Sequence, residues 1–310
     1  MPFVFYVQKF YGGELLLTEK EYIISKVLNN NVILAIDCRT RQELILVGKG
    51  IGFGKREGKK IKLQNKDIEK SFIAYDEKTK KEYFQLISQL DGNVMGISEE
   101  IIAIAEKHLG QLNSHIHIAL TDHIGFAIDR LKMGLEMNNP FLYEIRALYP
   151  EEFQAGLLAA EIIKDRLNVA ISESEVGFIA LHFHSARQNK RVTETMKDTR
   201  FLKEIIDLIQ GELSVSIDNR DLMYTRLINH LRVTLNRVEE KKYIENPLLS
   251  NIKEQFKESY RIAQKIGEYI KEKKHINVTE EELGYLALHI ERIKETSKII
   301  SKRVTESYQA

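Results

Sequence analysis

Glu175-Val-Gly-Phe-Ile-Ala-Leu-His182 recurs as Glu282-Leu-Gly-Tyr-Leu-Ala-Leu-His289, 107 positions further along the chain. The same offset relates other landmarks, so that Leu120, His123, Arg130 and Ser172 correspond to Leu227, His230, Arg237 and Thr279. In both copies the two matched histidines are 59 residues apart. One offset that holds at separated landmarks indicates a duplicated module. Each copy therefore carries two histidines at equivalent positions.

The sequence around the repeat has helical periodicity. Apolar residues recur at i, i+3, i+4 and i+7 in five segments, which are residues 82–90, 98–109, 112–131, 140–148 and 150–168. Each repeated stretch starts with a capping-box pattern, formed by Ser172 with Glu175 and by Thr279 with Glu282. We therefore predict two all-helical bundles over residues 82–190 and 196–300, with linkers near residues 74–81 and 188–197.

Residues 22–75 have a different texture and predict a small antiparallel β-sheet. Short stretches rich in β-branched residues at 23–28, 32–36 and 43–47, and a possible fourth strand at 50–54, are separated by polar turns. Between Tyr22 and Lys80 there are 13 Lys and Arg against 7 Asp and Glu. The segment is therefore either an ordinary solvated basic sheet or a nucleic-acid surface. A sheet of this size is marginal alone, so we expect it to pair with another copy.

Composition limits the remaining classes. The single cysteine, Cys38, excludes a disulfide framework and indicates a reducing compartment, the cytoplasm. No apolar run is long enough to cross a membrane, and a net charge of +1 argues against a globally basic nucleic-acid binder.

Residues 1–21 match neither the strand pattern nor the helical pattern. We interpret Gly12-Gly13-Glu14 as a translated purine-rich ribosome-binding site and assign this extension no function.

The matched histidines fit two chemistries as well as an inherited core. In a metal site, His123, His182 and Asp122 would be ligands, but Asn229 replaces Asp122 in the second copy and there is no His-Glu-x-x-His motif. In phosphoryl acceptance, a neutral imidazole is a competent nucleophile near pH 7. For the remaining five histidines we expect an ordinary role as buried, hydrogen-bonded imidazoles: His108, His115, His117, His184 and His275.

Two stretches of the sheet, Lys26-Val-Leu-Asn-Asn-Asn-Val32 and Val47-Gly-Lys-Gly-Ile-Gly-Phe-Gly-Lys55, resemble the RNA-binding domain of BglG-type transcriptional antiterminators. The duplicated module resembles that family's two PTS regulation domains, and the resemblance covers residues 22–297. The glycine string and His115–His123 are most similar to the branch that controls glucose-permease operons. The fold it implies is an antiparallel β-sheet RNA-binding domain followed by two all-α bundles.

The resemblance also implies site residues and partners. The RNA-binding positions that carry over are Lys26, Asn29, Asn31, Gly48, Lys49, Gly50 and Phe53. The phosphorylated residues are His123, His182, His230 and His289, with Asp122 at a family position beside the first, and the helical spacing places Arg130 and Arg237 near them. The implied partners are an RNA hairpin, the phosphocarrier protein HPr, the sugar permease EII component and a second copy of the chain. No cofactor, metal or catalysed reaction is implied. A DNA-binding activator and a metal-dependent hydrolase are the alternatives.

Overall fold

The computed structural model describes residues 19–73, 85, 90–242 and 244–307, so the predicted helix at 82–90 lies almost wholly outside the described residues. The chain divides into two compact units. The first unit comprises Met1–Pro140 with Tyr149–Thr195, and the second comprises Phe141–Leu148 with Met196–Ala310. The described part of the chain has no helix that combines the length and the hydropathy needed to cross a bilayer.

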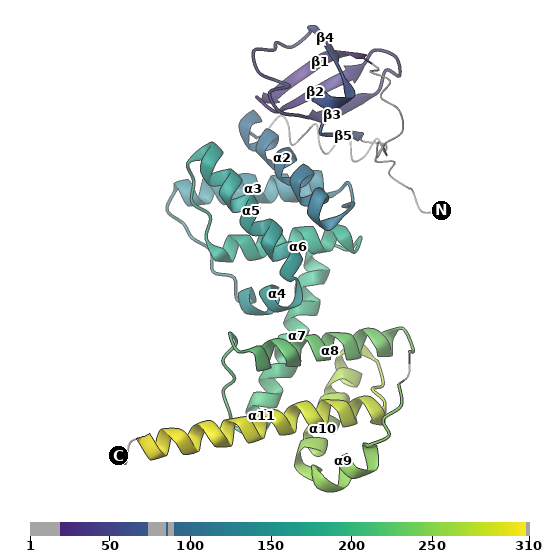
Figure 1. Cartoon of the computed structure of the whole chain (residues 1–310), viewed down its shortest axis with the longest axis vertical. Coiled ribbons are helices and arrows are strands. Elements are labelled where there is room, and N and C mark those ends of the chain that lie inside the picture. The colour runs from purple at the N-terminus through teal and green to yellow at the C-terminus, as the bar shows by residue number, and fades with distance from the viewer. Residues whose placement is uncertain (1–18, 74–84, 86–89, 243, 308–310) are drawn as a thin grey trace. The chain divides into compact units, whose positions relative to one another are not determined.

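The first unit begins with a five-stranded antiparallel sheet in the order β4-β1-β2-β3-β5 (Figure 1). Its strands are β1 (Lys20–Asn29), β2 (Val32–Asp37), β3 (Glu43–Val47), β4 (Lys60–Leu63) and β5 (Lys70–Ile73). The three predicted β-branched strands are confirmed. The predicted strand at 50–54 is wrong: this segment forms turns, because Gly50 and Gly54 take left-handed φ angles of 70° and 66°. The edge strands β4 and β5 were not predicted, since each has only four residues.

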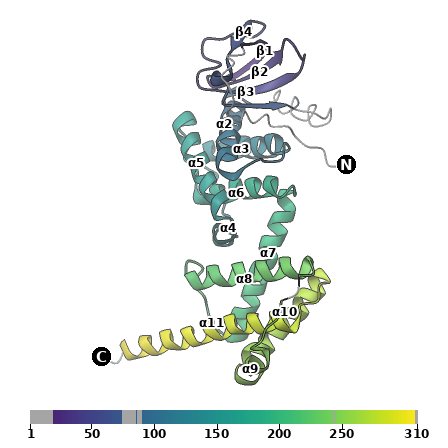
Figure 2. The same ribbon diagram turned by 45° about the vertical axis from the view of Figure 1, so that its right-hand side comes forward.

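Both faces of the sheet are apolar and covered. One face forms a cluster within the sheet domain itself, around Ile24, Ile33 and Leu46. The other face packs on Met95 and Ala103 of the first described helix, α2 (Gly92–Leu109). Figures 1 and 2 both show α2 directly against the sheet. One face of the sheet and α2 therefore share a hydrophobic cluster, which the sequence pattern alone did not indicate.

The helical part of the first unit continues with α3 (Ile116–Lys132), α5 (Pro150–Leu167) and α6 (Glu173–Arg187). Pro150 occupies the first turn of α5, where its missing N–H costs no hydrogen bond. Ser172 caps α6 by accepting a hydrogen bond from the Glu175 N–H. The α6 helix ends at Arg187 and the next helix begins at residue 192, so the predicted linker at 188–197 is shortened to residues 188–191.

The second unit is all-helical among its described residues. It contains α4 (Leu142–Leu148), most of α7 (Val192–Leu213), α8 (Leu222–Glu239), α9 (Leu249–Gln255), α10 (Lys257–Lys274) and α11 (Glu280–Ser307). The short helix α4 belongs here because it packs on α8, where the Tyr224 hydroxyl donates to the buried Glu144 carboxylate and Arg232 Nη1 donates to the Leu148 carbonyl at 2.8 Å. The observed fold class, a small antiparallel sheet followed by helical modules, is the predicted one.

Candidate RNA-binding loops and paired histidine sites

Two loops of the sheet meet at one edge and carry most of the predicted RNA-binding residues. Asn31 lies in the β1–β2 turn, and its side-chain oxygen accepts a hydrogen bond from the Gly50 N–H at 2.9 Å. The Gly48 N–H donates to the Asn31 carbonyl oxygen at 2.9 Å, which joins the loop after β3 to the same turn. Beyond these contacts Lys49 is exposed and Phe53 is 71% exposed. The loops therefore present a cation and an aromatic face on a braced backbone.

Glycine is required at two of these positions by close packing. A Cβ on Gly48 would collide with the Asp67 carbonyl oxygen, and one on Gly52 would collide with the Asn29 carbonyl oxygen. Gly52 was not among the predicted site residues, although it holds the two loops together.

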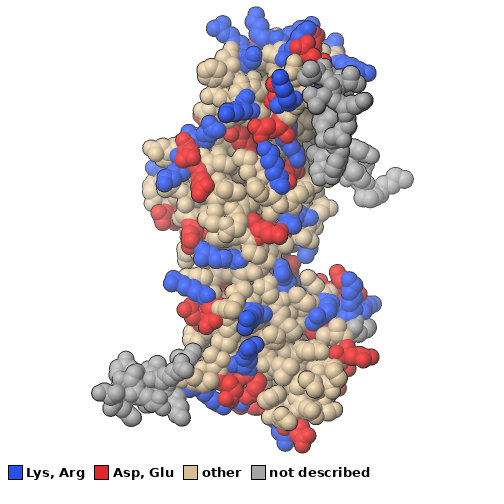
Figure 3. All heavy atoms as spheres, in the orientation of Figure 1, with Lys and Arg blue, Asp and Glu red and all other residues tan. Residues whose placement is uncertain are grey.

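Lys26, which was predicted, lies within β1 and is half-buried there. Exposed lysine and arginine side chains gather over the sheet in Figure 3.

Asn29 at the end of β1 and Asn31 in the β1–β2 turn are engaged by a carboxylate from α2. Asn29 Nδ2 donates to Glu100 Oε1 at 2.8 Å, and Asn31 Nδ2 donates to Glu100 Oε2 at 3.1 Å. Glu100 is only 8% exposed, and Arg166 Nη2 lies 3.4 Å from its Oε2. The amide groups predicted to contact RNA are thus occupied within the chain. Sequence analysis missed this contact, because Glu100 is 69 or more positions from either asparagine.

The first pair of matched histidines is brought together by α3 and α6. The ring centroids of His123 and His182 lie 4.9 Å apart. Glu175, which is fully buried, accepts a hydrogen bond from Arg130 on one carboxylate oxygen, while its Oε2 lies 3.4 Å from His123 Nε2. One carboxylate therefore hydrogen-bonds the arginine and lies within ion-pair distance of the histidine that the repeat had singled out.

The second pair, from α8 and α11, repeats the close contact of the two rings and the glutamate–arginine pair. His230 and His289 are stacked, with ring centroids 4.2 Å apart and planes 29° apart. Glu282, 2% exposed, accepts from Arg237 Nε at 2.7 Å and Nη2 at 2.8 Å. Its Oε2 also accepts from the Thr234 hydroxyl at 3.0 Å. Such a bidentate pair fixes the arginine plane against the carboxylate.

The predicted capping boxes are confirmed only in their first half. The Glu175 and Glu282 N–H groups donate to the Ser172 and Thr279 hydroxyls, both at 3.4 Å. The two glutamate side chains do not return to the helix start, because they turn inward to Arg130 and Arg237. Sequence analysis therefore missed both glutamates as site residues. Their identical place in the two copies was the available signal.

Burial favours the neutral form of three of these histidines, His182, His230 and His289. It lowers the pKa of His182 to about 3, with His123 contributing in the same direction. Burial lowers the pKa of His230 to about 4, assisted by His289 and Arg237. The pKa of His289 is also lowered, first by burial and then by Arg292. A neutral ring retains the lone pair that a nucleophile needs.

The other polar residues near the pairs differ between the copies. Asp122 is half-buried beside His123, whereas Asn229 donates to the carbonyl oxygens of Thr225 and Ala147 at 2.9 and 3.1 Å. Asn229 therefore has a structural role in the α4–α8 contact. In the part of the chain that the structure describes, no group of three His, Cys, Asp or Glu side chains is arranged to hold a metal ion.

The expectation for the remaining five histidines holds for two. His117 Nδ1 lies 2.7 Å from Glu99 Oε2, and His184 Nδ1 lies 2.9 Å from Glu152 Oε1. The expectation is wrong for the three that are exposed, which are His108, His115 and His275.

Comparison with known proteins gives matches over most of the chain. The model of the PRD domain matches residues 99–186 and 203–293, and that of the CAT RNA binding domain matches residues 22–81. Transcription antiterminator LicT of Bacillus subtilis (strain 168) is 34% identical over 274 residues, which cover 87% of this chain and 98% of LicT. Protein GlcT of Staphylococcus aureus (strain bovine RF122 / ET3-1) is 34% identical over 278 residues, which cover 89% of this chain and 98% of GlcT. The crystal structure of GlcT CAT-PRDI has 42% sequence identity over 55% of this chain and 99% of that chain, with a TM-score of 0.46.

Proposed function

The chain belongs to the family of transcription antiterminators that join a CAT RNA-binding domain to two PRD domains, and from this premise we propose that it controls a sugar phosphotransferase operon by binding leader RNA. It is a regulator and not an enzyme. The sugar is proposed to be glucose, since GlcT is among its relatives. The site of action is the cytoplasm, where the nascent RNA and the phosphocarrier are found.

The output is RNA binding by a dimer. Two copies of the sheet domain hold a hairpin that overlaps a terminator, so that the terminator does not form and polymerase continues into the operon. The exposed Phe53 stacks on a base and Lys49 meets a phosphate. Asn29 and Asn31 supply amide groups once they are released from Glu100. The observation that supports this output most directly is the joining of two loops, predicted separately, into one braced surface.

The input is phosphorylation of the paired histidines. A phosphoryl group places about two negative charges on a ring that was neutral. In the first module this charge arises next to the buried Glu175. Burial raises the pKa of this carboxyl, but His123 and Arg130 lower it by more, so its pKa is below the ordinary value. Phosphorylation of His123 or His182 by the permease EII component is proposed to disfavour the RNA-binding dimer when sugar is absent. Phosphorylation of the second module by HPr acts separately at His230 or His289.

The output is tested by a gel-shift titration of the full chain with its leader RNA hairpin, with the matching duplex DNA as control. We expect tight, salt-sensitive binding to the hairpin alone. Phe53→Ala should weaken that binding by about 1–3 kcal/mol, because it removes a stacking face. The substitution should leave the fold intact, since the Phe53 side chain is exposed. Preferred binding to the DNA duplex would overturn the proposal in favour of a DNA-binding activator. Equal hairpin affinity in Phe53→Ala would remove this surface from the RNA site.

A further inference from the structure

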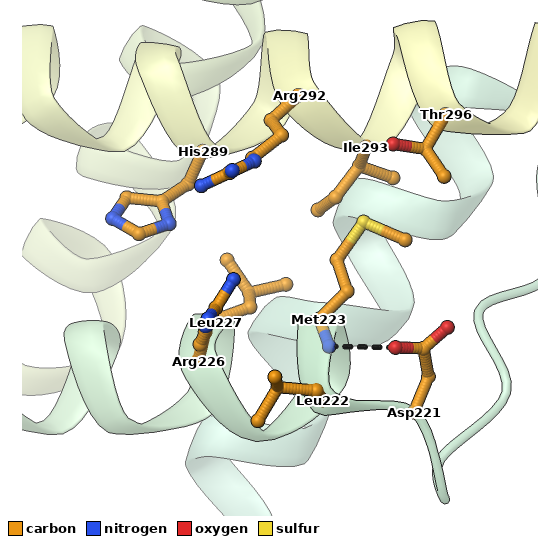
Figure 4. A pocket seen from close by; sticks show the side chains of 9 residues that line it. All are labelled: Asp221, Leu222, Met223, Arg226, Leu227, His289, Arg292, Ile293 and Thr296. Atoms are coloured by element: carbon orange, nitrogen blue, oxygen red, sulfur yellow. Dashed lines mark hydrogen bonds between the residues drawn. The ribbon is translucent and has the colours of Figure 1, made fainter.

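A pocket of about 230 Å³ in the second unit opens beside His289. It lies between α8 and α11, and Figure 4 shows the two helices on either side of it. Arg226 of α8 and Arg292 of α11 line the pocket together with the His289 ring. In Figure 4 the Arg292 guanidinium lies alongside His289, and Arg226 rises from α8 toward the same space.

The structure gives neither arginine a stabilising role in the fold. Both are exposed, and neither forms an ion pair or hydrogen bond with another residue that the structure describes. The one acidic residue of the pocket, Asp221, lies at its far end in Figure 4, where its Oδ1 accepts the Met223 N–H at 2.9 Å and caps α8. The end of the pocket next to His289 is therefore positive.

The first module lacks this pair of arginines. At the repeat offset of 107, Arg226 corresponds to Ala119 and Arg292 corresponds to Ser185. Ser185 is buried, and its hydroxyl bonds the Leu181 carbonyl at 2.6 Å and the Thr195 hydroxyl at 2.8 Å. The histidine pair and its glutamate–arginine brace are kept in both copies. A module of this kind therefore folds without the two arginines, which points to a ligand in the second copy.

We propose that Arg226 and Arg292 form a phosphoryl-binding site that receives and holds a phosphoryl group on His289, an inference that rests on the proposed regulation by histidine phosphorylation. The ligand class is a dianionic phosphoryl group carried in by a phosphohistidine protein. Two guanidinium groups match its charge and offer paired N–H donors to its oxygens. Of the two stacked histidines, His289 is the one that lines the pocket with the arginines, so we assign it as the phosphoryl acceptor in this module.

The transfer is balanced without a further reactant. A ring nitrogen of neutral His289 forms the new N–P bond as the N–P bond of the donor breaks, and the electron pair of the broken bond stays on the donor ring. His289 loses the proton of its other nitrogen to solvent, and the donor ring takes one up. The arginines act on the phosphoryl oxygens, which carry the charge throughout. They are positioning and binding groups for the phosphoryl group.

The experiment uses the full chain and phosphoramidate, a small donor with an N–P bond that needs no docking surface. Phosphorylation at each histidine is followed by peptide mass spectrometry under non-acidic conditions, together with its decay after the donor is removed. The variants are Arg226→Ala, Arg292→Ala and their combination, with Arg292→Lys to keep charge without the fork. Arg261→Ala, at an exposed position of α10, is the control for loss of one positive charge. Thermal unfolding checks that each variant is folded.

We expect the initial rate of labelling at His289 to fall about tenfold for each alanine variant, as for the loss of one charge-assisted hydrogen bond. Labelling of His182 should stay the same, because its module lacks these arginines. Arg292→Lys should recover part of the rate. Labelling of His289 at the wild-type rate in the double variant would overturn the site and leave the proposed function standing. An absence of label from all four histidines of the wild-type chain, with phosphoramidate and with phosphorylated HPr, would overturn both.

Discussion

The contact between Glu100 and two asparagines of the proposed RNA-binding surface, Asn29 and Asn31, leads to a quantitative prediction. In the described conformation this carboxylate accepts from Asn29 at 2.8 Å and from Asn31 at 3.1 Å. RNA that uses these amides must first displace it. Glu100→Ala removes the competitor and keeps a good helix-forming residue in α2. We therefore expect the variant to bind the leader hairpin more tightly than the wild-type chain.

The size of the effect follows from the hydrogen bonds that are lost. A hydrogen bond to a charged group contributes roughly 1.5–3 kcal/mol net. The released amides recover water, so we count one such bond for the pair and not two. The expected gain in RNA affinity is then about 1.5–3 kcal/mol, or roughly 10- to 150-fold.

The assay is a fluorescence anisotropy titration of labelled hairpin with the full chain at fixed ionic strength, since salt alone changes such affinities. Glu161→Ala is the matched control: it removes the same charge at an exposed position of α5. Gly96→Ala adds a neutral test, because a Cβ there would collide with the Asn29 side-chain amide and separate α2 from it. An affinity of Glu100→Ala equal to that of Glu161→Ala would refute the reasoning.

Three further predictions concern the paired histidines and the basic loop. Arg237→Ala should lower the free energy of unfolding by about 3–5 kcal/mol, because it leaves the buried Glu282 without its cation; Arg261→Ala should change it by less than about 0.5 kcal/mol in the same urea titration. His230 has a folded-state pKa of about 4, below its ordinary value of 6.5, so protonation favours the unfolded chain. Stability should therefore fall as the pH drops from about 6.5 to about 4, by up to roughly 3 kcal/mol, and a pH-independent unfolding free energy over that window would contradict the burial of the ring. Lys49→Ala should reduce the slope of log affinity against log salt by about 0.7–0.9, as expected for one phosphate contact; a slope equal to that of the wild-type chain would remove Lys49 from the RNA backbone.

Local patterns in the sequence determined the elements and the duplication. Helical spacing of apolar residues, β-branched runs and hydroxyl caps act over a few positions, so β1 to β3 and the cap of α6 at Ser172 could be predicted. The single offset of 107 located all four histidines. It also related Arg130 to Arg237, and both reach the same partner in their own copy. These features were open to sequence analysis because each is either local or repeated.

The tertiary structure alone decided which side chains meet across long separations. The sequence pattern predicts that Glu175 and Glu282 are ordinary capping residues. In the folded chain their carboxylates instead bind arginines 45 positions away. The contact of Glu100 with Asn29 and Asn31 depends on how α2 lies on the sheet, which no periodicity encodes. The physical reason is that a carboxylate is satisfied by any donor that folding brings within about 3 Å. Sequence separation does not restrict that choice, so only the packed chain selects the donor.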